Sequence, residues 1–378
     1  MGRHPRQRLH RRDGTAQPRH RRDTATVGRL ALDAGVDVDM VSNIYFKHLP
    51  AEVRAGRLPL AEVDSAVRRV LRVKYEMGLF ADPYRHSSEA RERALTLSPP
   101  YLAEARDMAR RSIVLLKNNG GALPLSKSLG TLAVIGTLAD DARSALGNWA
   151  AVGRPEDAVT ILAGIRQAVG TRTRVLYAPG APVDSADTTG FAEAVRVARQ
   201  ADAVVLVLGE HQDMSAEARN RTSLDLPGVQ LQLAQAVVAT DKPVVVILEN
   251  GRPLSIPWLA DHVPAILETL YLGVQMGPAV ADVLFSDANR GASSGVVPRT
   301  VRRVPVYYNH QNAGRPPDER ERYTSKYLDV PWTPQWAFGH GLSYTTFAYD
   351  APTLSATQVT MGDSVVVRVK SHQRRDAS

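Results

Sequence analysis

Apolar residues recur through the middle of the chain in two alternating patterns, short continuous runs and longer runs with helical spacing. The continuous runs predict buried strands at residues 113–118, 131–136, 174–180, 203–208, 242–248 and 265–272. The spaced runs predict helices at residues 159–169, 191–199, 229–239 and 278–285. Strands that alternate with helices and are apolar throughout indicate a mostly parallel sheet with helices on both faces, which is an α/β fold.

The pattern before residue 113 is mainly helical. Residues 60–77 place an apolar side chain on one face in each turn, with Pro before the first turn and Gly after the last. Ser98 and the two prolines after it predict the start of a second helix, which runs to about Ser112. The stretch VDVDM at residues 36–40 alternates strictly and predicts a strand.

The pattern breaks after Ser286. Residues 289–303 are basic, polar and aperiodic, so no element is predicted there. The apolar run VVVRV at residues 365–369 predicts the first strand or two of a separate β-domain.

Charge is distributed unevenly. The net charge is +8, and residues 1–28 contribute +6 of it through eight Arg against two Asp. This basic arm has too few apolar residues to pack a core, so residues 1–27 are predicted to be disordered. It has no apolar segment typical of a signal peptide and no element that reads bases, so neither an export signal nor a nucleic-acid partner is expected. No run is long enough to span a membrane, and the absence of Cys excludes disulfides.

Residues 201–227, ADAVVLVLGEHQDMSAEARNRTSLDLP, carry the most informative polar pattern. A predicted buried strand ends at Gly209-Glu210, and a loop follows with Asp213, Glu217 and Arg221. Loops at the end of a buried strand commonly carry function in α/β proteins. The sequence therefore predicts a site for a polar ligand here, with a solvated loop as the alternative.

Two further residues stand next to predicted strands or turns. Arg252 follows the strand at 242–248 and is expected either to hold a ligand or to bridge to a neighbouring loop, and we favour the bridge. His340 lies between two Gly in FGHGLSYTTF and is expected to be structural rather than to touch a substrate. No nucleotide-binding or metalloprotease motif is present, and no cofactor or metal is expected.

Several segments, taken in order, resemble family 3 glycoside hydrolases of the bacterial periplasmic β-glucosidase type. They include LALDAGVDVDM (30–40), ARRSIVLLKNNGGALPL (109–125), VLGEHQDMSAEARNRTSLDLP (207–227), LENGRPL (248–254) and FGHGLSYTTF (338–347). Their order and spacing match the family across roughly residues 28–350, and FGHGLSYTTF is the most specific of them.

The resemblance implies three domains after the arm. Residues 28–95 look like the C-terminal remnant of a TIM-like barrel with its exit linker. Residues 96–337 resemble the family's α/β sandwich, whose sheet is mostly parallel. Residues 338–378 look like a connector followed by the start of a fibronectin-III-like domain.

The resemblance also implies a retaining β-glucosidase, which needs a nucleophile and an acid/base carboxylate. Glu217 matches the family's acid/base position best, Glu210 is the alternative, and Arg221 is expected to contact substrate. The nucleophile Asp should lie just before residue 28, where the basic arm stands instead. We therefore expect the nucleophile to be absent and this chain to be inactive alone on a β-glucoside or oligosaccharide substrate.

A non-catalytic role is the alternative. The sandwich and the partial β-domain could bind glycans through Trp149, Trp332 or Trp336, although core or interface positions are the simpler expectation for these rings. Relatives in the family are periplasmic or secreted. No membrane association is expected, and the oligomeric state is left open.

Overall fold

The computed structural model describes residues 23–289, 292–311, 314–318 and 320–375. The chain divides into two compact units, the first ending at Thr96 and the second beginning at Leu97. The predicted basic arm lies outside the described residues except for residues 23–27. These few residues correct the boundary of the arm, because helix α1 begins at Thr24 and Asp23 caps it by accepting a hydrogen bond from the Thr26 amide.

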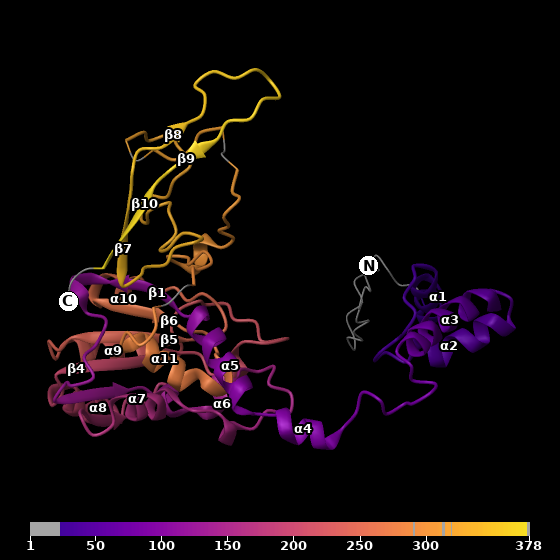
Figure 1. The fold of residues 1–378 in the computed structure, drawn as a ribbon, viewed down its shortest axis with the longest axis horizontal. Helices are drawn as coiled ribbons and strands as arrows, with labels where there is room; N and C mark the ends of the chain where they lie inside the picture. Colours follow the sequence, from indigo (N-terminus) through magenta and orange to yellow (C-terminus); the bar gives the residue numbers. More distant parts are fainter. Residues whose placement is uncertain (1–22, 290–291, 312–313, 319, 376–378) are drawn as a thin grey trace. The chain divides into compact units, whose positions relative to one another are not determined.

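The second unit is built on a six-stranded sheet with the order β1-β6-β5-β4-β2-β3 (Figure 1). Its strands are β1 (Val114–Asn118), β2 (Thr131–Ile135), β3 (Arg174–Ala178), β4 (Ala203–Gly209), β5 (Val244–Glu249) and β6 (Ala265–Glu268). Strands β3, β2, β4, β5 and β6 are parallel, and β1 pairs antiparallel with β6 at the edge. The predicted α/β sandwich with a mostly parallel sheet is therefore confirmed.

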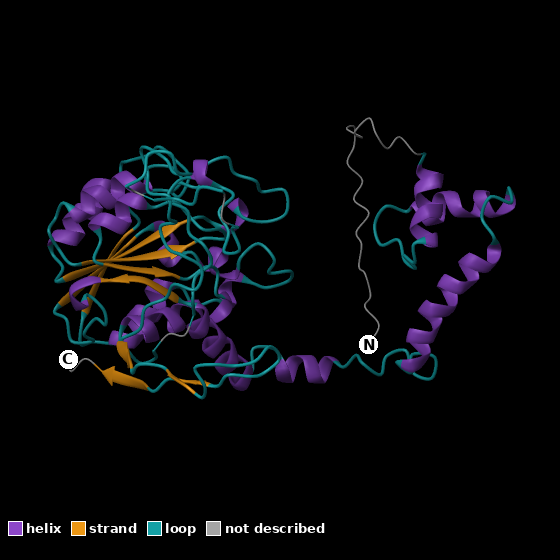
Figure 2. Ribbon diagram, turned by 90° about the horizontal axis from the view of Figure 1, so that it is seen from above, coloured by secondary structure: helices purple, strands orange, loops and turns teal. Residues whose placement is uncertain are grey.

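Helices lie on both faces of this sheet (Figure 2), and a layer of apolar side chains packs against each face. One layer contains side chains from α7 (Ile161–Val169) and α11 (Met276–Leu284), and the other contains side chains from α8 (Phe191–Arg199), α9 (Gln230–Val238) and α10 (Pro257–His262). Side chains of β4 alternate between the layers, and all seven of its residues are buried. A strand with helices on both sides needs an unbroken apolar run, which explains the sequence pattern.

The predicted helices and strands from residue 99 to residue 285 all form, with small differences at their ends. Helix α5 (Pro99–Ser112) starts at the predicted prolines, and a short helix α6 (Ala142–Leu146) was not predicted. Strand β6 ends at Glu268 and is shorter than predicted, because Leu270 adopts a positive φ that does not fit an extended strand. His340 is structural, as predicted, since its Nε2 lies 2.9 Å from the Leu116 carbonyl oxygen in β1.

The first unit is helical in its described part. It consists of α1 (Thr24–Asp33), α2 (Ile44–Arg54), α3 (Leu60–Glu76) and α4 (Glu89–Leu95). The helix predicted at 60–77 is confirmed, and Gly78 follows it with φ +71° as expected of a helix end. Its apolar stripe is poorly covered, however, because Val67 and Leu71 are 47% and 42% exposed.

The strand predicted at residues 36–40 does not form, which corrects the sequence-based expectation. No neighbouring strand in the described residues pairs with this stretch, and an extended segment without a partner has no ladder hydrogen bonds. Its two acidic side chains instead form contacts with residues of α2 and α3. Asp37 forms an ion pair with Arg69 of α3 at 2.7 Å, and Asp39 accepts hydrogen bonds from the Ile44 and Tyr45 amides at the start of α2.

The chain from residue 345 forms two small antiparallel pairs. Strand β7 (Thr345–Tyr349) pairs with β10 (Ser371–Arg375), and β8 (Thr353–Leu354) pairs with β9 (Val367–Arg368). The predicted run at 365–369 thus contains a strand of only two residues. That these pairs begin a fibronectin-III-like domain, and that the first unit is a barrel remnant, stay predictions.

Candidate active site

Three acidic residues follow or end neighbouring strands at one edge of the sheet. Glu210 comes directly after β4, Glu249 is the last residue of β5, and Glu268 is the last residue of β6. The strands are parallel and in register, with Gly209 beside Glu249 and Leu248 beside Glu268. The carboxyl edge of a parallel sheet is where α/β proteins commonly bind ligands, so this edge is the candidate site.

Glu210 is a fully buried carboxylate with two arginine partners. Its exposed fraction is 0%, and its Oε1 lies 2.6 Å from Nη1 of Arg221 and 3.1 Å from Nε of Arg252. The Gly251 amide donates to its other oxygen at 3.4 Å. A buried charge is tolerated when it is paired and hydrogen-bonded in this way.

The same two arginines hold the backbone of the loop that follows β4. Arg252 Nη2 donates to the carbonyl oxygens of Met214 and Arg219, the second at 2.9 Å. Arg221 Nη2 donates to the Asp225 carbonyl at 3.0 Å. The prediction that Arg252 bridges to a neighbouring loop is therefore confirmed.

Glu217 lies between the two carbonyls that Arg252 holds. It is exposed, and the next residue, Ala218, has the left-handed φ of +61°. The structure therefore places the two predicted acid/base candidates differently, with Glu217 on an exposed turn and Glu210 in the interior. Arg221, predicted to contact substrate, has its guanidinium on Glu210 and is 17% exposed.

Two acids of this edge were missed in the sequence. Both carboxylate oxygens of the buried Glu249 lack a hydrogen-bond partner among the described residues. Desolvation, and next the charge of Asp141, raise the pKa of Glu249 well above its usual value. Glu268 is partly exposed as a residue, but burial of its carboxyl group raises its pKa to about 8. An acid at the end of an apolar run was the available signal, because both residues share it with Glu210.

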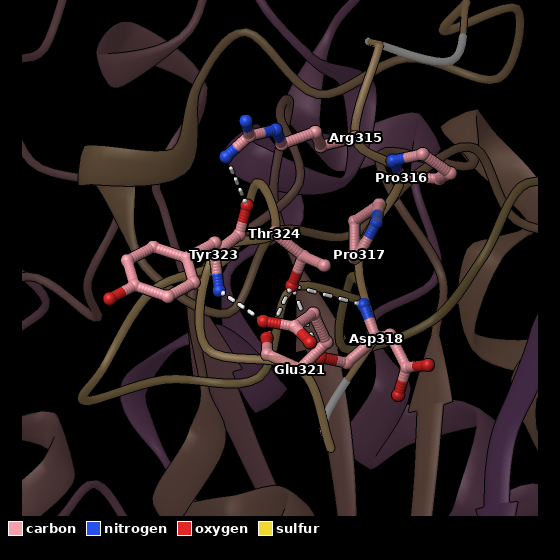
Figure 3. Close-up of a pocket in the computed structure, with 7 residues that line it drawn as sticks. All are labelled: Arg315, Pro316, Pro317, Asp318, Glu321, Tyr323 and Thr324. Carbon is pink, nitrogen blue, oxygen red and sulfur yellow. Dashed lines mark hydrogen bonds between the residues drawn. The ribbon is translucent and has the colours of Figure 1, made fainter.

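An open pocket lies in the irregular segment between α11 and β7 (Figure 3). Its floor is a local turn in which Thr324 Oγ1 accepts a hydrogen bond from the Asp318 amide at 3.2 Å and the Glu321 carboxylate accepts one from the Tyr323 amide at 3.0 Å. The lining residues are Arg315, Pro316, Pro317, Asp318, Glu321, Tyr323 and Thr324. The mixture of a guanidinium, carboxylates and an exposed ring suits a polar ligand.

Neither a candidate metal site nor a candidate membrane-spanning helix is found among the described residues. No group of three His, Asp or Glu side chains in them is arranged to hold a metal ion. Among the described helices, none has both the length and the apolar character needed to cross a membrane.

The sequence and the structure both match known glycosidases. Residues 113–344 match the model of the glycosyl hydrolase family 3 C-terminal domain. The periplasmic beta-glucosidase of Salmonella typhimurium is 42% identical over 368 residues, and a beta-xylosidase of Formosa agariphila is 38% identical over 355 residues. Each alignment covers 90% of this chain and 48% of the relative.

Solved structures agree with this result. A beta-glucosidase from Listeria innocua in complex with isofagomine superposes with a TM-score of 0.84 at 33% identity, covering 93% of this chain and 49% of that one. A beta-glucosidase from Erythrobacter marinus gives a TM-score of 0.79 at 33% identity, with the same coverage. This chain spans about half the length of the relatives it matches.

Proposed function

Because the chain belongs to glycoside hydrolase family 3, we propose that it serves the hydrolysis of β-glucosides or short β-linked oligosaccharides with retention of configuration. The observation that carries this proposal is an exposed acid, Glu217, on a braced loop at the carboxyl edge of the sandwich sheet. Relatives named beta-xylosidases make β-xylosides the second substrate class to test. The hydrolysis requires no cofactor.

We propose Glu217 as the acid/base residue. A general acid must reach the glycosidic oxygen, give up its proton to the leaving group, and then take a proton from water. An exposed side chain on a turn can do so, whereas Glu210 is enclosed between two guanidinium groups and the Gly251 amide. The Arg221 guanidinium is paired with Glu210, so we propose that Arg221 does not contact substrate directly. It contributes to the site by enclosing Glu210.

The nucleophile is not assigned to a described residue. Asp23, the one acid among residues 23–27, caps α1 through both of its oxygens. Its hydrogen bonds to the Thr26 amide and hydroxyl hold its pKa below the usual value, as expected of a cap rather than a nucleophile. We therefore propose that this chain alone turns over β-glucosides slowly or not at all, since one carboxylate supplies only half of the mechanism.

The test is a chimera in which this chain replaces the aligned half of the Salmonella typhimurium relative. We expect it to hydrolyse a nitrophenyl β-glucoside, and we expect Glu217→Gln to lose at least about 100-fold in kcat, because the glycosyl-enzyme then lacks a general base for its hydrolysis. Azide should restore turnover of Glu217→Gln on a substrate with a good leaving group, because azide attacks the glycosyl-enzyme without a general base.

The matched control is Glu193→Gln, which removes an acid from the exposed surface of α8. It should leave the chimera's activity unchanged. A folded chimera that binds β-glucosides but keeps full activity with Glu217→Gln would contradict the assignment.

A binding role is the second candidate, and the exposure of two tryptophans favours it. Trp149 and Trp332 are 68% and 40% exposed, whereas Trp336 is only 9% exposed and belongs to an apolar layer of the sandwich. Exposed aromatic rings can stack on sugar rings. Calorimetric titration with laminaribiose tests this role, and no heat of binding from a folded chain would exclude it at the concentrations used.

The compartment is proposed from the relatives. The Salmonella typhimurium relative is named a periplasmic enzyme, so we propose that this protein works in the periplasm or outside the cell. Fractionation of cells that produce the protein, followed by immunoblotting, tests the proposal.

A further inference from the structure

The turn that carries Glu217 is closed by one side chain. Arg252 Nη2 donates to the carbonyl of Met214, three residues before Glu217, and to that of Arg219, two residues after it. A single donor nitrogen thus fixes the separation of the two ends of the turn. Backbone carbonyls held by a charged donor are among the stronger protein hydrogen bonds.

Arg252 is itself held in place from two sides. Its Nε lies 3.1 Å from the buried Glu210 carboxylate, and its own carbonyl accepts a hydrogen bond from Asn250 Nδ2 at 2.8 Å. Gly251, the residue before it, approaches the turn so closely that an added Cβ would lie 2.1 Å from Ser215 Oγ. The turn and the end of β5 are therefore fitted to each other.

We propose that Arg252, oriented by Glu210, is a positioning residue that sets where the Glu217 carboxyl is presented. The inference rests on the proposed function only in that Glu217 is the acid/base. It is separate from the packing of the sandwich, because the two apolar layers on the sheet are formed by other residues.

The chemistry of the guanidinium explains why this position needs arginine. Three contacts in different directions are made by two of its nitrogens, with Nε on Glu210 and Nη2 on the two carbonyls. The ammonium of lysine is a single compact donor group and cannot reach the carboxylate and both carbonyls with this geometry. Arg252→Lys keeps a positive charge beside Glu210 but opens the turn.

The experiment uses the full chain and two readouts that do not require turnover. Hydrogen–deuterium exchange follows the amides of residues 211–222 and, separately, those of β4 and β5. Carbon-13 NMR of the chain labelled at the glutamate carboxyl carbon follows the Glu217 signal, which is assigned by its loss in Glu217→Gln. The variants are Arg252→Lys, Arg252→Gln and Glu210→Asp.

We expect Arg252→Lys and Arg252→Gln to speed exchange in residues 211–222 by about 10-fold or more and to shift the Glu217 signal, while β4 and β5 keep their protection. Glu210→Asp should fall between wild type and Arg252→Gln, because the shorter acid still attracts the guanidinium. The matched control is Arg196→Lys, which alters an exposed arginine–glutamate pair on α8 and should change neither readout.

The proposal is overturned if Arg252→Lys leaves loop exchange and the Glu217 signal as in wild type. It is also overturned if exchange rises equally in the loop, β4 and β5, because Arg252 would then serve only the stability of the sheet. These outcomes are independent of whether Glu217 is the acid/base, which the activity of the chimera decides.

Discussion

Both units of this protein carry regular patterns of apolar residues, but they bury these residues to very different extents. In the sandwich, every residue of β4 is buried and Leu206 is 0% exposed. In the first unit, α3 buries only Ala66, and the core cluster of the described residues contains only four buried apolar residues, Leu32, Leu49, Leu58 and Ala66. A periodic pattern predicts an element, whereas burial depends on whether another surface packs against it.

The largest expected difference between the units is the effect of truncating an apolar side chain. Leu206→Ala in the centre of the sheet should lower the free energy of unfolding by about 3 kcal/mol, because it removes buried methyl groups and leaves a cavity. Leu71→Ala in α3 should change it by less than about 0.5 kcal/mol, because this side chain is 42% exposed. Urea unfolding followed by circular dichroism checks both, and similar losses would show that α3 is buried in solution.

A smaller difference is expected between ion pairs. Arg106 of α5 donates two hydrogen bonds to Asp282, whose side chain is 5% exposed, and Arg106→Gln should cost about 2 kcal/mol. Arg69→Gln in the first unit removes a more exposed pair with Asp37 and should have no measurable effect. The same unfolding assay decides, and an equal cost at both sites would contradict the comparison.

The stability of the two units should change with pH in opposite directions. The raised pKa of Glu268, about 8, means that the folded sandwich binds its proton more tightly than the unfolded chain, whose reference value is 4.5. This contribution to stability is present below pH 4.5 and is lost as the pH rises to about 8. Glu249, with its pKa also raised, adds to the same trend.

Asp39 in the first unit behaves in the opposite way. Desolvation raises its pKa, but hydrogen bonds from Ser42, Tyr45 and Ile44 together outweigh it and leave the pKa below the reference value of 3.8. Its contribution is present above pH 3.8 and is lost as the pH falls. We expect Glu249→Gln to reduce the loss of sandwich stability at high pH, and Asp39→Asn to reduce the loss of first-unit stability at low pH. Thermal unfolding between pH 3 and 8 measures both effects. Parallel curves of stability against pH for wild type and both variants would refute these expectations.

The smallest expected effect concerns the neutral form of Glu249. Its two oxygens accept no hydrogen bond among the described residues, so replacing the acid by Leu removes a desolvated polar group at little cost in packing. At pH 8 we expect Glu249→Leu to be as stable as wild type or more stable by about 1 kcal/mol. A clear loss of stability at that pH would mean that the carboxyl group has a partner in solution.

Much of the sandwich could be predicted from the sequence because its strands are covered on both faces. The apolar run at Ala203–Gly209 can bury its side chains on both faces only as an inner strand of a covered sheet, so pattern and structure agree. The VDVDM stretch shows the limit, since alternation predicts a strand only if a neighbour is there to pair with it. The apolar runs of the sandwich were therefore enough to predict its strands, whereas the alternation at residues 36–40 did not reveal that a pairing strand is missing among the described residues.

The candidate site was predictable in part for the same reason. The loop at 210–225 and the bridging role of Arg252 follow from the ends of β4 and β5, which the pattern located. The pairing of Arg221 with Glu210 depends on the direction of two side chains across the loop, and spacing does not encode it. Glu249 and Glu268 were missed because only strand order shows that three acids end neighbouring strands.

Either Glu217 or Glu210 protonates the leaving group, and a leaving-group series in the chimera decides between them. If Glu217 is the acid, Glu217→Gln should lower kcat/KM for methyl β-glucoside by at least about 100-fold but barely change kcat/KM for a dinitrophenyl β-glucoside, because kcat/KM reports formation of the glycosyl-enzyme and this leaving group needs no proton. Glu210→Gln should lower kcat/KM for both substrates to a similar extent, because it loosens the loop that carries Glu217. The opposite result, with the leaving-group dependence in Glu210→Gln, would contradict the account.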